Sequence, residues 1–309
     1  MTHAAGRDQL ILEGPHGRQL EVLLAGPLDG MPLVFHSGTP SGLTEFRPMT
    51  QAASARGLRT VLYSRPGYGG STPQPGRKVA DAAPDVAAIL DQIGAGDFVT
   101  VGTSGGGPHA LACAAMLPGR CLAAASVAGI APRDAAGLDW LGGMGPENLE
   151  EIAAAADSRE ALTVFLEAAA SSLRQVTAAH LAEELGGLVS ATDKAALSGE
   201  YAEYLASSFR AAVSTGIAGW RDDDLAFVRD WGFSVAAGGP VPVAIWQGAQ
   251  DKMVPYAHGE WLAAHVPGAR AHLLPGEGHL TLTVTSFGEI LDDLLDLAGR
   301  EIPGGARFG

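Results

Sequence analysis

The sequence predicts an α/β protein built on a mostly parallel, doubly wound β-sheet with an inserted all-helical cap. Three observations support this fold class. Short apolar runs alternate with helical patterns in both terminal parts of the chain, which is typical of a parallel sheet with helices on both faces. The alternation stops in the middle of the chain, where only helical patterns occur. Glycine-rich and polar segments follow most apolar runs, at the sheet edge where ligands bind in such folds.

The first two apolar runs, Leu10–Leu12 and Leu20–Leu24, flank Gly14-Pro-His-Gly17 and predict a β-hairpin. The later runs are expected to be parallel strands because a helical pattern follows most of them. We expect these strands at 32–36, 59–63, 98–101, 121–127, 241–246 and 271–274. We expect helices of the sheet at 44–57, 81–93, 109–116, 259–265 and 287–298.

The middle of the chain predicts the cap. No convincing strand pattern occurs between about residues 131 and 219, and helices are expected at 146–156, 159–176, 178–185 and 193–213. Ser158 and Thr192 are placed to act as N-caps of the second and the last of these helices. We therefore divide the chain into a core of residues 1–130 and 220–309 and a helical cap of residues 131–219.

Composition limits the partners. The chain has 309 residues, of which 47% are hydrophobic, and a net charge of −14. This acidic surface would repel phosphate backbones, so we expect no nucleic-acid partner. No apolar run is long enough for a membrane span and no targeting signal is evident, so we expect no membrane partner and a cytoplasmic location. Cys113 and Cys121 lack the spacing of a metal site and are expected to be buried thiols. The protein is expected to be a monomer or a homodimer.

One motif predicts a nucleophile. Gly102-Thr-Ser104-Gly-Gly106 fits G-x-S-x-G between an apolar run and a helical pattern, the context of a nucleophile elbow. The glycines leave room for close backbone passage, and the amide of Gly105 can stabilise an oxyanion. Two alternatives are a plain glycine-rich turn and a dinucleotide-binding G-x-G-x-x-A pattern over Gly105–Ala110. The second lacks a well-placed acidic residue after a following strand.

A serine nucleophile needs a base, and the base needs an orienting group. His279 follows the last apolar run, and Asp251 follows the run before it. The order Ser, Asp, His is the one expected for an elbow of this type. Ser104, Asp251 and His279 are therefore the predicted catalytic residues.

A second oxyanion donor is expected in the segment His36-Ser-Gly-Thr-Pro40, which follows the third apolar run. The amide of Thr39 is the candidate. His36 is a candidate for substrate contact, or it braces this loop by hydrogen bonding. His109 lies either in the pocket wall or in packing at the helix start. Arg65 is expected in a buried hydrogen-bond network beneath the site.

The cap is expected to select the substrate. Its aromatic side chains either line an apolar pocket or pack within the cap, and the candidates for substrate contact are Trp140, Phe165, Tyr204 and Trp220. An amine substrate would instead require acidic cap residues that face the site. The acidic candidates in the cap are Glu150, Glu151, Glu183 and Glu184. The alternative is that these side chains face solvent.

Together these pieces resemble the α/β-hydrolase superfamily, in its serine hydrolase branch with a helical cap. The resemblance runs from Pro32 to Val284 and includes Ser37-Gly-Thr-Pro40 and the loop Arg65-Pro-Gly-Tyr-Gly-Gly-Ser71. Within the cap only helicity matches. The segment Gly219–Phe227 is similar to the return from cap to core, and its acidic residues are expected to cap a helix and pair with basic neighbours. The family usually has His-Gly before the oxyanion residue, where this chain has Ser37-Gly38.

The resemblance implies a serine hydrolase that cleaves a carboxylic ester or lactone of a small, largely apolar substrate through an acyl-enzyme. Water is the second reactant, and neither a cofactor nor a metal is implied. Serine at position 104 argues against dehalogenases and epoxide hydrolases, which carry aspartate there. The open alternatives are an aminopeptidase or amidase similar to proline iminopeptidases, a carbon–carbon bond hydrolase, a cofactor-free perhydrolase and a non-catalytic binding protein.

Overall fold

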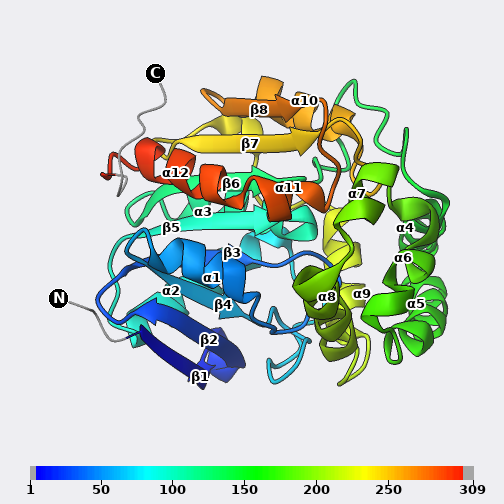
Figure 1. Cartoon of the computed structure of the whole chain (residues 1–309), viewed down its shortest axis with the longest axis horizontal. Helices are drawn as coiled ribbons and strands as arrows, with labels where there is room; N and C mark the ends of the chain where they lie inside the picture. The colour runs from blue at the N-terminus through cyan, green and yellow to red at the C-terminus, as the bar shows by residue number, and fades with distance from the viewer. Residues whose placement is uncertain (1–4, 302–309) are drawn as a thin grey trace.

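An eight-stranded sheet forms the centre of the molecule (Figure 1). The computed structural model describes residues 5–301. The strand order is β1-β2-β4-β3-β5-β6-β7-β8, with β1 and β2 antiparallel to their neighbours and the other pairs parallel. The predicted mostly parallel sheet and its leading hairpin are thereby confirmed. The strands are β1 (Ala5–Glu13), β2 (Gln19–Pro27), β3 (Met31–His36), β4 (Leu58–Tyr63), β5 (Phe98–Thr103), β6 (Cys121–Val127), β7 (Val243–Gly248) and β8 (Arg270–Leu274).

Helices cover both faces of the sheet, as the doubly wound prediction requires. Helices α1 and α12 pack on one face, and α2, α3 and α10 pack on the other. None of the helices within residues 5–301 has the length and hydropathy of a membrane span. The helices of the sheet are α1 (Arg47–Ser54), α2 (Ala82–Gln92), α3 (Gly107–Met116), α10 (Tyr256–His265), α11 (Thr281–Thr285) and α12 (Phe287–Leu297).

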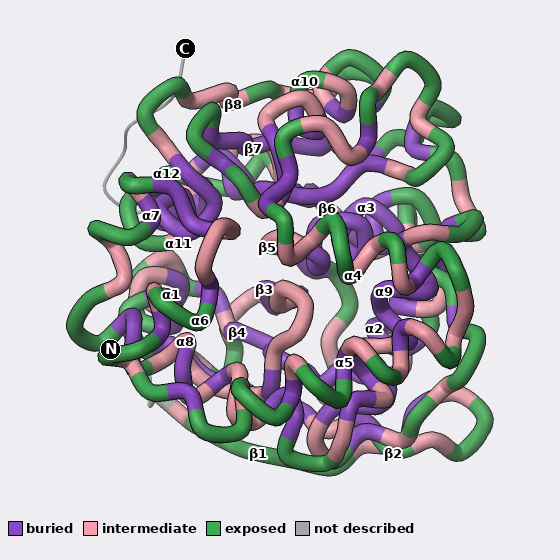
Figure 2. The backbone as a smooth tube through the Cα atoms, turned by 90° about the vertical axis from the view of Figure 1, so that its right-hand side faces the viewer, coloured by how far each residue is buried: buried purple, intermediate pink, exposed green. Residues whose placement is uncertain are grey.

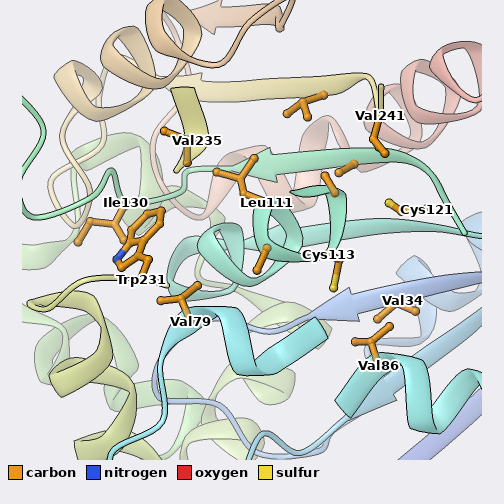
Figure 3. Packing of buried hydrophobic residues seen from close by; sticks show 14 of the residues in the cluster. Val34, Val79, Val86, Leu111, Cys113, Cys121, Ile130, Trp231, Val235 and Val241 are labelled. Carbon is orange, nitrogen blue, oxygen red and sulfur yellow. The ribbon is translucent and has the colours of Figure 1, made fainter. Parts of the chain in front are cut away.

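The core lies on both sides of the central strands because successive strand residues point to opposite faces. In β3, Val34 packs beneath α2 and α3, whereas Leu33 and Phe35 pack beneath α1 and α12. Figure 3 shows the first of these clusters, with Cys113 and Cys121 within it. Both cysteines are buried, free thiols. Burial raises the pKa of the Cys121 thiol to about 12, so this thiol acts as a small apolar side chain.

The cap is inserted between β6 and β7, beyond the carboxyl ends of the central strands (Figure 1). Seen from that side, α4, α5, α6 and α8 lie around β3 and β5 (Figure 2). The predicted division between residues 219 and 220 falls inside α9. This helix belongs to both parts, since Trp220 packs into the cap and Phe227 packs against the sheet. The cap helices are α4 (Pro146–Asp157), α5 (Arg159–Leu173), α6 (Leu181–Glu184), α7 (Ala191–Ala196), α8 (Gly199–Ala212) and α9 (Ala218–Phe227).

The structure corrects one predicted cap helix. The single helix expected at 193–213 is two helices, α7 and α8, which are separated where Gly199 takes a φ of 54°. Thr192 lies inside α7 and is not its N-cap. Ser190 caps this helix instead, because its hydroxyl accepts a hydrogen bond from the amide of Asp193 at 3.1 Å. Ser158 caps α5 in the same way, through the amide of Ala161 at 3.1 Å.

The cap has a small hydrophobic core of its own, which predicts how it responds to mutation. Leu166 of α5 is fully buried, whereas Val164 on the same helix is 74% exposed. We expect Leu166→Ala to lower the free energy of unfolding by about 2–5 kcal/mol through lost burial and a residual cavity. Val164→Ala is the control and should change it by less than about 0.5 kcal/mol. Urea denaturation measures both values, and equal effects would contradict the packing described here.

Candidate active site

Ser104 occupies a strained turn between β5 and α3. Its φ is +54°, a left-handed value that a residue with a side chain rarely adopts. A Cβ atom on Gly102 would lie 2.1 Å from the carbonyl oxygen of Gly106, and one on Gly106 would lie 2.0 Å from that of His36. Both glycines are therefore needed for the close backbone contacts that raise Ser104 above the sheet edge.

Asp251 and His279 come from the segments after β7 and β8 and are hydrogen-bonded to each other. The distance from His279 Nδ1 to Asp251 Oδ2 is 2.8 Å, and both side chains are buried. The Asp251 carboxylate also accepts hydrogen bonds from Gln247 Nε2 at 3.0 Å and from the amides of Met253 and Val254 at 2.9 and 2.8 Å. These donors hold the carboxylate in one orientation, and the carboxylate in turn orients the imidazole ring.

The electrostatics of His279 follow from this pair. Burial by itself lowers the pKa of His279, but the charge and hydrogen bond of Asp251 outweigh it, so the pKa lies above the ordinary value. Because Nδ1 is bonded to Asp251, the ring can offer only Nε2 to a reacting group. This is the arrangement of a general base.

Ser104 and His279 both line one cavity of about 360 Å³ between the sheet edge and the cap. A larger open groove of about 530 Å³ lies near the amino ends of β3 and β4, far along the sheet from both residues. The smaller, cap-covered cavity is therefore the candidate site, in agreement with the edge at which open α/β sheets bind ligands.

The segment after β3 lies against Ser104. A Cβ atom on Gly38 would lie 3.3 Å from Ser104 Cβ, so the backbone of this loop passes directly beside the serine. Thr39 and Gly105 both border a side pocket of about 70 Å³ that Ser104 also lines. The two amides proposed as oxyanion donors thus belong to residues that border the same pocket as the serine.

A buried ion cluster holds this loop in place. Arg65 donates a hydrogen bond to the carbonyl of Gly38 at 3.0 Å and another to Thr39 Oγ1 at 2.9 Å. Thr39 Oγ1 donates to Asp223 of α9 at 2.9 Å, and Arg65 and Arg77 each lie 2.6 Å from the same carboxylate. Burial alone would raise the pKa of Asp223, but the two guanidinium groups lower it, so this carboxylate is ionised. Arg65 thus lies in a buried network.

Three of the six residues proposed for substrate contact lie in the cavity wall. Phe165, Tyr204 and Trp220 line it, and they come from three different cap helices, α5, α8 and α9. Two of the four acidic cap candidates, Glu151 and Glu184, also line this cavity. The other two, Glu150 and Glu183, are exposed on the cap surface and are not part of its wall.

The structure corrects the other three. His36 is fully buried beneath the elbow, where Nδ1 hydrogen-bonds to Tyr63 Oη at 3.0 Å, and burial keeps its pKa well below the ordinary value. His109 is bonded to the carbonyl of Gly105 at 2.9 Å, and burial lowers its pKa to about 3. Trp140 donates to the carbonyl of Ala131 at 2.8 Å. Each is used in packing and lies outside the cavity wall.

Sequence reasoning missed Asp193, a fully buried cap residue that contacts the His279 segment. Its carboxylate accepts hydrogen bonds from the backbone amides of His279, Leu280 and Thr281 at 3.1, 2.7 and 3.3 Å, and from Ser190 Oγ at 2.9 Å. Its negative charge also raises the pKa of His279. Nothing in the local pattern signals this role, because an aspartate early in a helix is usually read as part of the capping.

The described residues contain no group of three or more His, Cys, Asp or Glu side chains arranged to hold a metal ion.

The Asp193 contact predicts a measurable shift at His279. Asp193→Asn removes one negative charge and weakens the acceptor of three amides, so we expect it to lower the pKa of the His279 ring. Titration of the ring by NMR measures this, with His279→Gln used to assign the signal. The control is Asp157→Asn, an exposed cap position that should leave the titration unchanged. An unaltered or raised pKa in Asp193→Asn would contradict this electrostatic role.

Comparison with known proteins gives relatives of the same fold. The chain aligns with the structure of a bromoperoxidase from Bacillus anthracis with a TM-score of 0.68 and 20% identity, covering 94% of this chain and 100% of that one. It aligns with an esterase from Exiguobacterium antarcticum with a TM-score of 0.67 and 17% identity, again over 94% and 100% of the two chains. These TM-scores show a shared fold, and identities this low show no more than that.

A curated relative is similar in sequence over a shorter stretch. It is a non-heme chloroperoxidase from Streptomyces lividans, 34% identical over 109 residues, which are 35% of this chain and 40% of that protein. The match therefore spans less than half of the relative. The model of the alpha/beta hydrolase fold family, in contrast, matches residues 31–284, which is most of the chain. With the sheet order and helical cover described above, this match shows that the chain belongs to the α/β-hydrolase fold family.

Proposed function

We propose that the protein is a serine hydrolase that cleaves a carboxylic ester or lactone through an acyl-enzyme. One observation carries this proposal. Ser104, in its strained turn, lines the same cavity as His279. The Nδ1 atom of His279 is hydrogen-bonded to Asp251 at 2.8 Å. A nucleophile, a base and an orienting carboxylate from three strand ends are the parts that acyl transfer to water requires.

In the proposed mechanism Ser104 Oγ attacks the substrate carbonyl while His279 Nε2 accepts the proton of the serine hydroxyl. Asp251 keeps the proton of Nδ1 in place and stabilises the imidazolium that forms. The amides of Thr39 and Gly105 donate to the oxyanion, and Arg65 holds the Thr39 loop through the carbonyls of Ser37 and Gly38. His279 then protonates the leaving group and activates a water molecule, which releases the acid and restores Ser104.

The cavity supports a small substrate with a mainly apolar body. Leucine, phenylalanine and tyrosine side chains from α5 and α8 make up much of the wall, and the volume of about 360 Å³ is at the lower end of the range for small-molecule sites. Water is the second reactant in this proposal. The amidase and carbon–carbon hydrolase alternatives would use the same cavity and form different products. The binding-protein alternative would use this cavity and form no product.

A second candidate comes from the names of the relatives, two of which are called chloroperoxidase and bromoperoxidase. If hydrogen peroxide replaced water in the second step, it would take the acyl group from Ser104 and leave as a peracid. This reaction needs the same three side chains. An assay of peracid formation from a short ester and hydrogen peroxide tests it beside hydrolysis.

Mutation of Ser104 tests the proposed nucleophile. We expect Ser104→Ala to lower kcat/KM for a 4-nitrophenyl ester by roughly four orders of magnitude or more, since the acyl-enzyme can no longer form. A fluorophosphonate probe should label the wild-type protein on Ser104 and leave the variant unlabelled. Near wild-type activity in the variant would reject the mechanism. Absence of both labelling and turnover in the wild-type protein would favour the binding-protein alternative.

The pH dependence of activity tests the proposed base. A general base acts only when it is neutral, so kcat/KM should fall as the pH drops through the pKa of His279. Because Asp251 raises that pKa, we expect the midpoint of the acid limb to lie above the ordinary histidine value of about 6.5. A profile of kcat/KM against pH for the same ester measures it. A midpoint below 6 would be inconsistent with His279 as the base.

A further inference from the structure

Three consecutive aspartates, 222–224, lie on α9, and all three are buried. Two of them are neutralised by arginines. Asp223 is held by the two guanidinium groups described above, and Asp222 lies 3.4 Å from both Arg159 and Arg221. Asp224 forms no ion pair with any residue in the described part of the chain. The expectation that these acids pair with basic neighbours therefore holds for two of the three.

The side chain of Asp224 meets a second carboxyl group, that of Glu151 on α4. The two carboxyl groups interact through a side-chain hydrogen bond. Burial, and for Asp224 also the charge of Glu151, raises the pKa of each group. Trp220 Nε1 donates to Glu151 Oε1 at 2.6 Å. Asp224 is 3% exposed, and no amide, hydroxyl or other fixed donor within residues 5–301 reaches its Oδ2.

This carboxyl pair lies next to the reacting atoms. Glu151 and Asp224 line the side pocket of about 70 Å³ that Ser104, Thr39 and Gly105 also line. The pocket is too small for more than a few non-hydrogen atoms. A group bound there would therefore be separated by only a few bonds from a carbonyl carbon placed at Ser104.

The charge of the surrounding wall has one sign. The main cavity is lined by Glu147, Glu151 and Glu184, and no lysine or arginine occurs among the described residues that line it. The remaining wall is mostly apolar. A neutral ligand would leave these carboxyl groups without a cationic partner, whereas a cation with N–H donors would supply an opposite charge and charge-assisted hydrogen bonds.

We propose that the side pocket is an ammonium subsite, in which Glu151 and Asp224 bind the protonated amine of the substrate. The substrate class is then an ester or amide with an apolar body and an amino group a few bonds from the scissile carbonyl. The positive charge of the amine offsets the negative charge of these two side chains, both of which line the pocket. This inference rests on the proposed acyl transfer at Ser104, because it names the substrate of that site.

Two matched esters test the proposal. Leucine ethyl ester and ethyl 4-methylpentanoate differ only in the α-amino group, and the readout is the ratio of their kcat/KM values. We expect the wild-type protein to prefer the amine. Glu151→Gln and Asp224→Asn should each lower this ratio by about tenfold to a hundredfold, as for the loss of a charge-assisted hydrogen bond. Since the ratio compares two substrates on one protein, partial loss of folded enzyme cancels.

Glu150→Gln is the control, because Glu150 is the exposed neighbour of Glu151 on the same helix and lies outside the pocket. It should leave the ratio at the wild-type value. A wild-type preference for the neutral ester, or a ratio unaffected by both pocket variants, would overturn the ammonium subsite while leaving the proposed hydrolysis standing.

Binding to the Ser104→Ala variant separates the two proposals. Calorimetry with leucinamide and 4-methylpentanamide measures the preference for the amine without any chemical step. We expect tighter binding of leucinamide, and loss of that difference when Asp224→Asn is added. If this difference is found but neither ester is hydrolysed by the wild-type protein, the subsite stands and the proposed acyl transfer fails. Equal binding of the two amides would overturn the subsite.

Discussion

The interaction on which the site most depends is the buried contact of Asp223 with Arg65 and Arg77. It joins the helix that returns from the cap to the loop that carries Thr39. Removing the carboxylate would leave two guanidinium groups buried without a counter-charge, which is far more costly than losing an exposed ion pair. The position of the loop that carries Thr39 is therefore tied to the position of α9, and through α9 to the cap.

A second contact ties the cap to the other half of the site. Asp193 of α7 binds the amides of the segment that begins at His279. A Cβ atom on Gly278 would lie 2.4 Å from this carboxylate, so the approach also requires a glycine. The cap thus contacts both the His279 segment and the loop that carries Thr39, and it does so through two buried aspartates. In the proposed mechanism the cap therefore positions the reacting groups as well as enclosing the cavity.

The fold class followed from the sequence because hydrophobic periodicity and chain order report on it directly. The strand runs, the hairpin and the helices on both faces are recognisable from local patterns, and so is the long strand-free segment. The break between α7 and α8 was not predicted, because Gly199 and the Ser190 cap change the backbone without breaking the helical pattern. Similarly, α9 carries residues of both the cap and the sheet packing, so no composition change marks a boundary within it.

By itself, the sequence determined the sheet, the cap insertion and the positions of Ser104, Asp251 and His279 after their strands, because these depend on local patterns and on order along the chain. Tertiary structure alone decided which polar side chains meet. His36, His109 and Trp140 are drawn into packing, whereas Asp193, Glu151 and Asp224 come together with partners distant in sequence. Burial and pairing of a charge depend on contacts between elements, and the local sequence pattern does not predict which elements will be in contact.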